Sequence, residues 1–330
     1  MARRFDRCIG GYAGCGNLGD DAILLGYLGN LTEEERRRTV VLSGSPRRDG
    51  RRFGVRCVGR KSPLAVAISF LRSRCFLLGG GSLLQNGTGN LSLLYYLGLL
   101  RLARICGCST ELLAAGIGPL RGRRAIRWVV SELKKCRFIY LRDANSARLL
   151  AEWGISPSKM AIVPDPARYL RPPAISRRYF LLRELGFYPF TSYYCVVLRP
   201  PVSAVDDCVC VISQALRVLC RQNGCVPIFL LFDAPHDGAI TSRVCRAAGG
   251  AVARLRDVSD ALALISGCRG LLSMRLHGLI LANSLGIPSI AISPDPLEPK
   301  LAAFCLDHSI PHLAPSQVTV KALVELMGWD

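Results

Sequence analysis

The sequence predicts an α/β protein made of two Rossmann-like domains whose parallel sheets face a cleft. Short apolar or β-branched runs alternate with longer helical stretches along the 330 residues, which is typical of parallel sheets covered by helices. Hydrophobic residues make up 50% of the chain, enough to build two sizeable cores. A stretch rich in proline, arginine and aromatic residues, 168–192, interrupts the alternation and is typical of a linker. We therefore place the boundary near Pro172, between domains 1–172 and 173–330.

In the first domain, apolar runs bounded by glycine, proline or charged residues predict the strands, and amphipathic stretches predict the helices between them. The predicted strands are 7–13, 39–45, 74–81, 110–118, 137–143 and 160–165, and the predicted helices are 20–30, 91–105, 122–135 and 144–153. In the second domain, the same signals predict strands 193–200, 226–232, 251–255, 270–274 and 288–293, and helices 206–222, 237–248, 258–267 and 276–285. Ligands of such open sheets bind beyond the carboxyl ends of the strands.

Positive charge is concentrated in the first domain. Residues 1–172 carry 29 Lys and Arg against 12 Asp and Glu, whereas residues 173–330 carry 14 against 12. A field of this kind attracts nucleic acid, an anionic membrane surface or a phosphorylated substrate. Fifteen scattered cysteines without a paired-ligand pattern predict reduced thiols and a cytoplasmic location. The basic charge extends this expectation to the inner face of the cell membrane. We expect neither a secretory signal nor a membrane-spanning helix.

The first motif, "GYAGCGNLGDDAIL", satisfies the glycine spacing of a dinucleotide site, with Gly14, Gly16 and Gly19 between a strand and a helix. However, Asp20 and its acidic neighbour would repel a pyrophosphate at the helix start. We therefore expect the glycines to allow close approach of a ligand or of the partner domain, with Asn17 and Asp20 as the exposed polar groups. Asp20 is equally well explained as the N-cap of the helix, and the two roles are compatible.

The second motif, "LLGGGSLLQNGTGNLS", follows a predicted strand. Its consecutive glycines leave main-chain amides accessible to sugar hydroxyls or phosphate. The binding candidates here are Gly80, Gly81, Ser82 and Asn86. Arg142 ends another predicted strand at the same edge, and its alternative role is an ion pair with Asp143 or with a neighbouring strand end.

The third motif, "SMRLHGLILANSLG", places Arg275 and His277 where an apolar strand turns into an apolar helix. Unpaired helix amides, the helix dipole and a guanidinium together favour an anion site at that junction. A bound anion would favour the protonated form of His277, so this residue could act as a general acid.

These motifs, with "AAGIGPL", "VPDPA" and "VVLRP", resemble the polysaccharide pyruvyl transferases, and in particular the CsaB-type cell-wall pyruvyltransferases. The resemblance covers almost the whole chain. It implies a fold of the glycosyltransferase-B type and transfer of the pyruvyl group of phosphoenolpyruvate to a sugar as a cyclic ketal. In the CsaB type this sugar is an N-acetylmannosamine of a lipid-linked precursor.

The resemblance also implies roles for individual residues. The arginine, leucine and histidine of the family's RLH motif correspond to Arg275, Leu276 and His277, and a further family arginine corresponds to Arg142. A family lysine corresponds to Lys300. The segment before that lysine departs from the family pattern, because Pro294 replaces the usual tyrosine and extra residues precede Lys300.

The proposed chemistry agrees with the residues themselves. Phosphoenolpyruvate carries a phosphate and a carboxylate, and the cations available to hold them are Arg275, Arg142, Lys300 and Arg199. We expect His277 to supply the proton that the methylene carbon takes up, with Asp20 as the alternative acid. Because the sequence lacks a DxD motif and a His/Cys cluster, we predict that the enzyme needs no metal and no cofactor besides phosphoenolpyruvate as co-substrate.

The basic first domain predicts an acceptor bearing a lipid diphosphate and peripheral contact with an anionic membrane. Two alternatives remain. A sugar-nucleotide glycosyltransferase of the same fold would need an acidic residue to hold a ribose, and helix 276–285 has none. A nucleic-acid binder is suggested by charge alone and has no recognition motif, so we expect no nucleic-acid partner.

Overall fold

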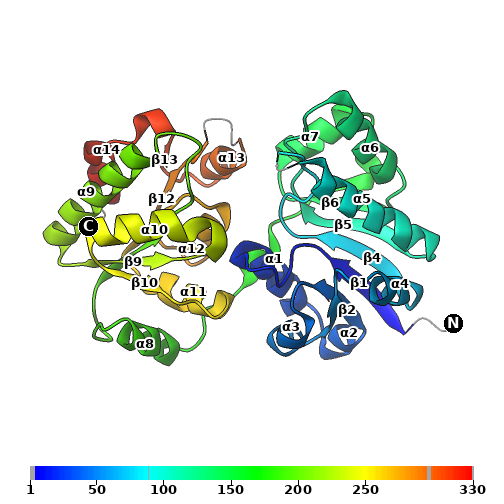
Figure 1. Ribbon diagram of the computed structural model, residues 1–330, viewed down its shortest axis with the longest axis horizontal. Coiled ribbons are helices and arrows are strands. Elements are labelled where there is room, and N and C mark those ends of the chain that lie inside the picture. The colour runs from blue at the N-terminus through cyan, green and yellow to red at the C-terminus, as the bar shows by residue number, and fades with distance from the viewer. Residues whose placement is uncertain (1–3, 88, 296–298, 329–330) are drawn as a thin grey trace. The chain divides into compact units, whose positions relative to one another are not determined.

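The computed structural model describes residues 4–87, 89–295 and 299–328, and the chain divides into two compact units, 1–167 and 168–330. Each unit contains a parallel sheet with helices on both faces, which confirms the predicted fold class (Figure 1). The division falls between Ala167 and Arg168, shortly before Pro172. In the described part of the chain, no helix has both the length and the apolar character needed to cross a membrane. All fifteen cysteines are free thiols.

In the described residues of the first unit, seven strands form a sheet in the order β3-β2-β1-β4-β5-β6-β7, and every pairing is parallel. The strands are β1 Phe5–Gly10, β2 Thr39–Ser43, β3 Arg56–Gly59, β4 Ser73–Gly79, β5 Ser109–Ala115, β6 Phe138–Leu141 and β7 Met160–Ile162. The α-helices are α1 Leu18–Gly29, α2 Glu33–Arg37, α3 Pro46–Phe53, α4 Pro63–Leu71, α5 Asn90–Ile105, α6 Arg123–Leu133 and α7 Ala144–Glu152. Short 3₁₀ turns are η1 Pro157–Lys159 and η2 Pro166–Tyr169.

Both faces of this sheet are buried. Along β4, Phe76 and Leu78 pack in the core formed with α4, α5 and α6, whereas Leu77 packs on the opposite side with residues of α1 and α3. Figure 1 shows α5 and α6 on one side of the sheet and α1 and α3 on the other. Because side chains alternate between the faces of a strand, burial of both faces explains why the strands are apolar runs rather than alternating ones.

In the described residues of the second unit, six parallel strands follow the order β10-β9-β8-β11-β12-β13. The strands are β8 Tyr193–Val197, β9 Val226–Leu230, β10 Ala251–Ala253, β11 Gly270–Ser273, β12 Ser289–Ile292 and β13 His312–Leu313. The helices are α8 Ile175–Glu184, α9 Val205–Asn223, α10 Ala234–Ala248, α11 Val258–Ile265, α12 Leu276–Ser284, α13 Pro299–Asp307 and α14 Val320–Met327, with the 3₁₀ turn η3 Pro315–Gln317.

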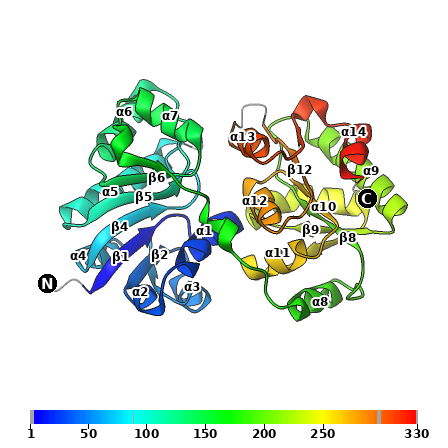
Figure 2. The ribbon, with the colours of Figure 1, turned by 180° about the vertical axis from the view of Figure 1, so that it is seen from behind.

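One core of the second unit lies between the sheet and helices α9, α10 and α14, with Phe229, Leu272 and Ile290 contributed by the strands. Figure 2 shows α9 and α14 side by side over this face. On the other face of the sheet, the phenol of Tyr193 donates a 2.7 Å hydrogen bond to the carbonyl oxygen of Leu264 in α11. The sheet of the second unit is therefore also covered on both faces.

The interpretation of residues 168–192 as a linker is wrong in part. Residues Ile175–Glu184 form α8, which packs against α11 and buries Leu181 and Leu182. Arg177 in α8 forms a 2.5 Å ion pair with the buried Asp260 in α11. The stretch looked irregular because only Leu181 and Leu182 of α8 are buried, while Ile175 and Phe180 are exposed along with the charged residues.

Helix α1 carries the first motif, and Gly26 fixes its position. A Cβ at Gly26 would overlap the carbonyl group of Pro166, so only a glycine allows the helix to approach that main chain. Gly98 in α5 has no neighbouring heavy atom within 4 Å of a Cβ position. The two glycines thus differ in packing although both lie inside helices.

We predict that Gly26→Ala lowers the free energy of unfolding by about 1–3 kcal/mol, because the added methyl group forces backbone against backbone. The control Gly98→Ala should instead raise it by about 0.5–1 kcal/mol, the usual gain when alanine replaces glycine inside a helix. Urea unfolding of the three proteins measures both changes. Equal stabilisation by the two substitutions would show that α1 does not depend on this close approach.

Candidate functional site

The loop after β1 begins the candidate site of the first unit. Asn17 is the N-cap of α1, since its side chain accepts a hydrogen bond from the backbone N–H of Gly19 at 2.9 Å. The alternative that Asp20 is the cap is therefore wrong, and Asp20 lies in the first turn of the helix. Gly16 has φ +97° and no heavy atom within 4 Å of a Cβ position, so its backbone conformation requires glycine while its surroundings are open.

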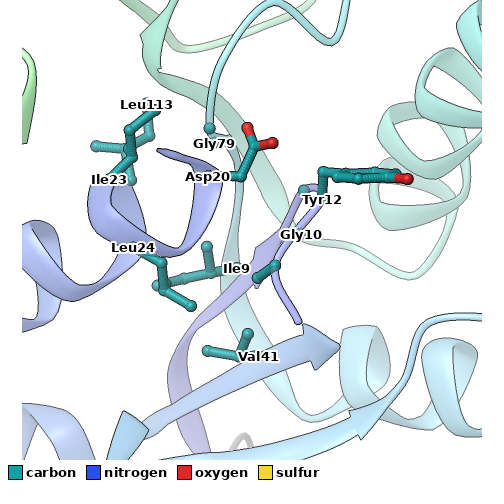
Figure 3. Close-up of a pocket in the computed structure, with 12 residues that line it drawn as sticks. Ile9, Gly10, Tyr12, Asp20, Ile23, Leu24, Val41, Gly79 and Leu113 are labelled. Carbon is teal, nitrogen blue, oxygen red and sulfur yellow. The ribbon is translucent and has the colours of Figure 1, made fainter. Parts of the chain in front are cut away.

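Asp20 lies against the glycine loop after β4. A Cβ on Gly81 would be 2.6 Å from Oδ1 of Asp20, and one on Gly80 would be 3.6 Å from the same oxygen. Figure 3 shows the Asp20 carboxylate beside Gly79 at the edge of a small pocket whose inner wall is apolar. The loops of the first two motifs therefore meet, and the bare backbone at Gly80 and Gly81 makes room for a carboxylate.

The neighbouring Asp21 has a structural role. Its carboxylate accepts hydrogen bonds from the Gly14 N–H at 2.8 Å and from Nη1 of Arg52 at 2.6 Å, and the side chain is buried. Burial raises the pKa of Asp21, and the charge of Arg52 opposes this shift. A Cβ at Gly14 would overlap the carboxylate of Asp49, so this glycine accommodates a buried carboxylate of its own unit.

Arg142 follows β6 and is almost fully buried, with 8% of its side chain exposed. Its Nη1 lies 3.5 Å from a carboxylate oxygen of Asp165, and its Nη2 donates to Oγ of Ser82 at 3.2 Å. Asp143 is not its partner, because that side chain caps α7 by accepting from the Ser146 N–H. In this arrangement, Arg142 holds the glycine loop and the segment after β7 together. The alternative of an ion pair with a neighbouring strand end is confirmed, because Asp165 follows β7, the neighbour of β6. The sequence did not identify Asp165 itself.

Asn86, predicted to bind substrate, uses its amide to fix the loop after β5. Its Oδ1 accepts from the Arg121 N–H at 2.7 Å, and its Nδ2 donates to the Arg121 carbonyl oxygen at 2.9 Å. These two hydrogen bonds connect the loop after β4 to the loop after β5 at the same edge of the sheet. Asn86 therefore shapes the site in this structure by positioning the loop that carries Arg121.

In the second unit, Arg275 is the N-cap residue of α12 and follows β11 at the carboxyl edge of the sheet. Its guanidinium donates through Nε to Oδ2 of Asp237 at 2.8 Å and through Nη2 to Oδ1 at 2.5 Å. Asp237 is fully buried; burial raises the pKa of its carboxyl, and the bonds and charge of Arg275 lower it. The expected anion-binding arginine therefore already has a bidentate carboxylate partner.

A histidine that the sequence did not single out joins this network. Asp233, which follows β9, lies 3.5 Å from Nη2 of Arg275 and 2.8 Å from Nδ1 of His236. The His236 side chain is 71% exposed. The stretch "FDAPHDG", just after a buried strand, contains Asp233, His236 and Asp237. Their position at a strand end was the sequence feature that could have identified them.

His277 lies in the first turn of α12, next to Leu276, and both are half-buried. Gly278 follows, and a Cβ there would be 2.5 Å from Oγ of Ser273. Ser273 itself bonds both the N–H and the carbonyl oxygen of Arg275. The tight turn from β11 into α12 thus fixes the backbone that carries Arg275 and His277.

Two further predicted cations lie on elements of the same unit. Arg199 follows β8, the neighbour of β11, and Lys300 lies in the first turn of α13. The N–H of Val202 donates to the carbonyl oxygen of Pro294 at 3.0 Å, which joins the loops after β8 and β12. Residues 296–298 of the segment before Lys300 lie outside the described residues. The described parts of the chain contain no group of three or more His, Cys, Asp or Glu that could hold a metal ion.

A family model described as polysaccharide pyruvyl transferase matches residues 17–296, most of the chain. No curated protein matches the chain. Solved structures with similar folds include the UDP-GlcNAc 2-epimerase of Methanocaldococcus jannaschii, with 10% identity, a TM-score of 0.65 and coverage of 98% of this chain and 92% of that one.

Two other similar structures are known with ligands. One is the UDP-GlcNAc 2-epimerase of Neisseria meningitidis bound to UDP-GlcNAc, with 11% identity, a TM-score of 0.60 and coverage of 97% and 90%. The other is HepE of Anabaena in complex with UDP-glucose, with 11% identity, a TM-score of 0.59 and coverage of 97% and 88%. At these identities the similarity shows the fold alone, two Rossmann-like domains as in glycosyltransferase-B proteins.

We predict that Asp237→Ala lowers the free energy of unfolding by about 3 kcal/mol, because it leaves the guanidinium of Arg275 without its bidentate partner. As a control, Asp206→Ala removes an exposed ion pair with Arg243 and should cost less than about 1 kcal/mol. Urea unfolding measures both. If the two substitutions had the same small effect, the Arg275–Asp237 pair would not be what holds the start of α12.

Proposed function

This chain belongs to the polysaccharide pyruvyl transferase family, and we propose that it transfers the pyruvyl group of phosphoenolpyruvate to a sugar of a lipid-linked cell-wall polysaccharide precursor. The product is a cyclic ketal, and phosphate is released. We further propose that the enzyme is of the CsaB type and that the acceptor sugar is N-acetylmannosamine. The observation that carries the proposal is the junction of β11 and α12, where a helix N-terminus, a fixed guanidinium and His277 come together.

The Arg275–Asp237 pair holds the junction of β11 and α12 in a fixed orientation. Because Asp237 balances the charge of Arg275, the pair orients the first turn of α12 without adding net positive charge. The amides of that turn then point toward an anion, as the dipole of the helix favours. We assign the remaining cationic contacts with phosphate and carboxylate to Arg199 and Lys300, since both belong to the same unit.

One acid in the second unit is sufficient for the proposed reaction. His277 gives a proton to the methylene carbon of phosphoenolpyruvate, and a sugar hydroxyl attacks the adjacent carbon and loses its proton to restore the histidine. The second hydroxyl then attacks the same carbon, the carbon–oxygen bond to phosphate breaks, and phosphate leaves with the second hydroxyl proton. A guanidinium and an ammonium can stabilise the departing charge, so we propose that no metal is needed.

The first unit serves the acceptor in this proposal. The Asp20 carboxylate beside Gly80 and Gly81 accepts hydrogen bonds from sugar hydroxyls in this proposal, and the protonated carboxyl group of Asp20 is the alternative acid. Asn17 and Gly16 belong to the same loop, and we expect their backbone to line the acceptor rather than the Asn17 side chain, which caps α1. Arg142 and Ser82 act by holding the glycine loop in place.

The competing function is a sugar-nucleotide-dependent glycosyltransferase of the same fold. Two of the similar structures contain bound sugar nucleotides, UDP-GlcNAc in the epimerase of Neisseria meningitidis and UDP-glucose in HepE. This alternative predicts binding of UDP-sugars and no release of phosphate from phosphoenolpyruvate. Helix α12 has no acidic residue that could hold a ribose, which favours the pyruvyl transferase.

We predict acceptor-dependent release of phosphate from phosphoenolpyruvate by the purified protein, with a lipid-diphosphate disaccharide ending in N-acetylmannosamine as acceptor. His277→Ala should lower kcat about 100- to 10,000-fold, the usual contribution of a general acid. The control His308→Ala removes an exposed histidine just after α13 and should leave kcat unchanged. The mass of the product should show a ketal, and a chelator should not reduce turnover.

The same assay separates the alternatives. Loss of activity in Asp20→Asn together with retention in His277→Ala would assign the acid to Asp20. Phosphoenolpyruvate binding without turnover would mean that the acceptor is wrong. Absence of phosphoenolpyruvate binding with UDP-sugar binding would replace the proposed function by the glycosyltransferase, and loss of turnover in chelator would overturn the metal-independent mechanism.

We also predict that the protein binds vesicles containing anionic lipid and dissociates as salt is raised, because the basic first unit is attracted to negative surface charge. Co-sedimentation with liposomes measures this binding, with neutral phosphatidylcholine vesicles as the control. Equal binding to both kinds of vesicle, or no effect of salt, would contradict peripheral contact with an anionic membrane.

A further inference from the structure

Arg60, which follows β3 in the first unit, lies in a cage of tyrosine rings. Its guanidinium carbon is 5.3 Å from the ring centre of Tyr12, 5.0 Å from that of Tyr95 and 5.7 Å from that of Tyr96. Nη2 of Arg60 donates to the phenol oxygen of Tyr96 at 3.2 Å, and the phenol of Tyr95 donates to the Arg60 carbonyl oxygen at 2.9 Å. The loop after β1 and helix α5 thus hold one cation in a fixed position.

Within the described residues, no ion pair joins Arg60 to a carboxylate. The second donor contact of Arg60 is to the thiol sulfur of Cys15, at 3.2 Å. Tyr96 stays neutral, because burial raises the pKa of its phenol to about 12 even though Arg60 opposes that shift. The rings attract the guanidinium through their negative faces, but they carry no net charge.

Other buried or partly buried arginines of the first unit form ion pairs with carboxylates. Arg52 has the carboxylate of Asp21, Arg142 has that of Asp165, and Arg104 has that of Glu132. A carboxylate partner is the ordinary solution for a guanidinium that is partly removed from water. Arg60 departs from this pattern, and its fork of donors keeps capacity for an anion that is not part of the chain.

The cage lies beside the proposed acceptor site. Tyr12 and Asp20 line the same pocket, and Figure 3 shows the Tyr12 ring extending away from its apolar wall. The Asp20 carboxylate is also close enough to raise the pKa of Tyr96. Lys61, on the loop after β3, and Arg47, in the first turn of α3, are exposed and add positive charge at this edge of the sheet.

We infer that Arg60, held by Tyr12, Tyr95 and Tyr96, binds the phosphate groups of the acceptor and thereby selects acceptors that carry a diphosphate. Phosphate matches the planar donor fork of arginine, and the nearby charges of Lys61 and Arg47 suit a group with more than one negative charge. This inference rests on the proposed function, because it assigns the anion to the acceptor of that reaction.

The test compares two acceptors that carry the same saccharide, one on a lipid diphosphate and one on an uncharged alkyl group. Arg60→Gln should raise the KM of the diphosphate acceptor about 10- to 100-fold, the effect of losing charge-assisted hydrogen bonds. The KM of the uncharged acceptor and the KM of phosphoenolpyruvate should not change. A higher KM for phosphoenolpyruvate alone would overturn the inference and place the donor at Arg60.

Two variants separate binding from folding. Arg56→Gln removes the same charge from the other end of β3, where Arg56 lies over the ring of Phe5, and should leave both acceptor constants unchanged. Arg60→Lys keeps the charge but not the fork, so it should give a smaller rise in KM than Arg60→Gln. Equal effects of Arg56→Gln and Arg60→Gln would show that only the overall charge matters, which would contradict a site at Arg60.

A binding measurement without turnover distinguishes this inference from the proposed function. Calorimetry with inorganic pyrophosphate should show binding by the wild type and about 10-fold or greater weakening in Arg60→Gln, with thermal unfolding as the check on folding. Unchanged pyrophosphate affinity in a folded Arg60→Gln would overturn the anion site itself. If affinity is lost but no acceptor gives turnover, the anion site stands and the proposed reaction fails.

Discussion

Parallel pairing of the strands is the constraint on which the candidate site depends. Because the paired strands of each sheet run in the same direction, the loops that follow them emerge at one edge, and the helices must cover both faces. In the first unit this brings the loops with Asp20, Arg60, Gly80 and Arg142 to one edge. In the second unit it does the same for the loops with Asp233 and Arg275.

The second organising feature is the way in which buried charge is neutralised. Arg275 with Asp237 and Arg142 with Asp165 use a carboxylate to satisfy a guanidinium at a strand end, and each pair holds a loop that carries other candidate residues. Such pairs fix geometry and contribute little net charge. In the proposed function, the attraction for anionic substrates therefore comes from other cations, and Arg60 is surrounded by three tyrosine rings.

Several pairings in the site could not be predicted from a local sequence pattern. Asp165 is separated from Arg142 by 23 positions, and Asp237 from Arg275 by 38, so neither partner follows from a short motif. Arg60 lies between Gly59 and Lys61 without a motif of its own, and its tyrosines come from two distant segments. Helix α8 was missed for a related reason. Its exposed residues include Ile175 and Phe180 as well as arginines, so the sequence does not mark the side that packs on α11.

The sequence by itself determined the fold class, the order of most strands and helices, and the strand-end positions of Arg142, Arg275 and His277. It could do so because apolar periodicity and glycine-rich turns are local properties of the chain. Only the tertiary structure decided which charges are paired, that Asn17 rather than Asp20 caps α1, and that Gly81 makes room for the Asp20 carboxylate. Those choices depend on distances between residues far apart in sequence, which are set when the sheet and its helices pack together.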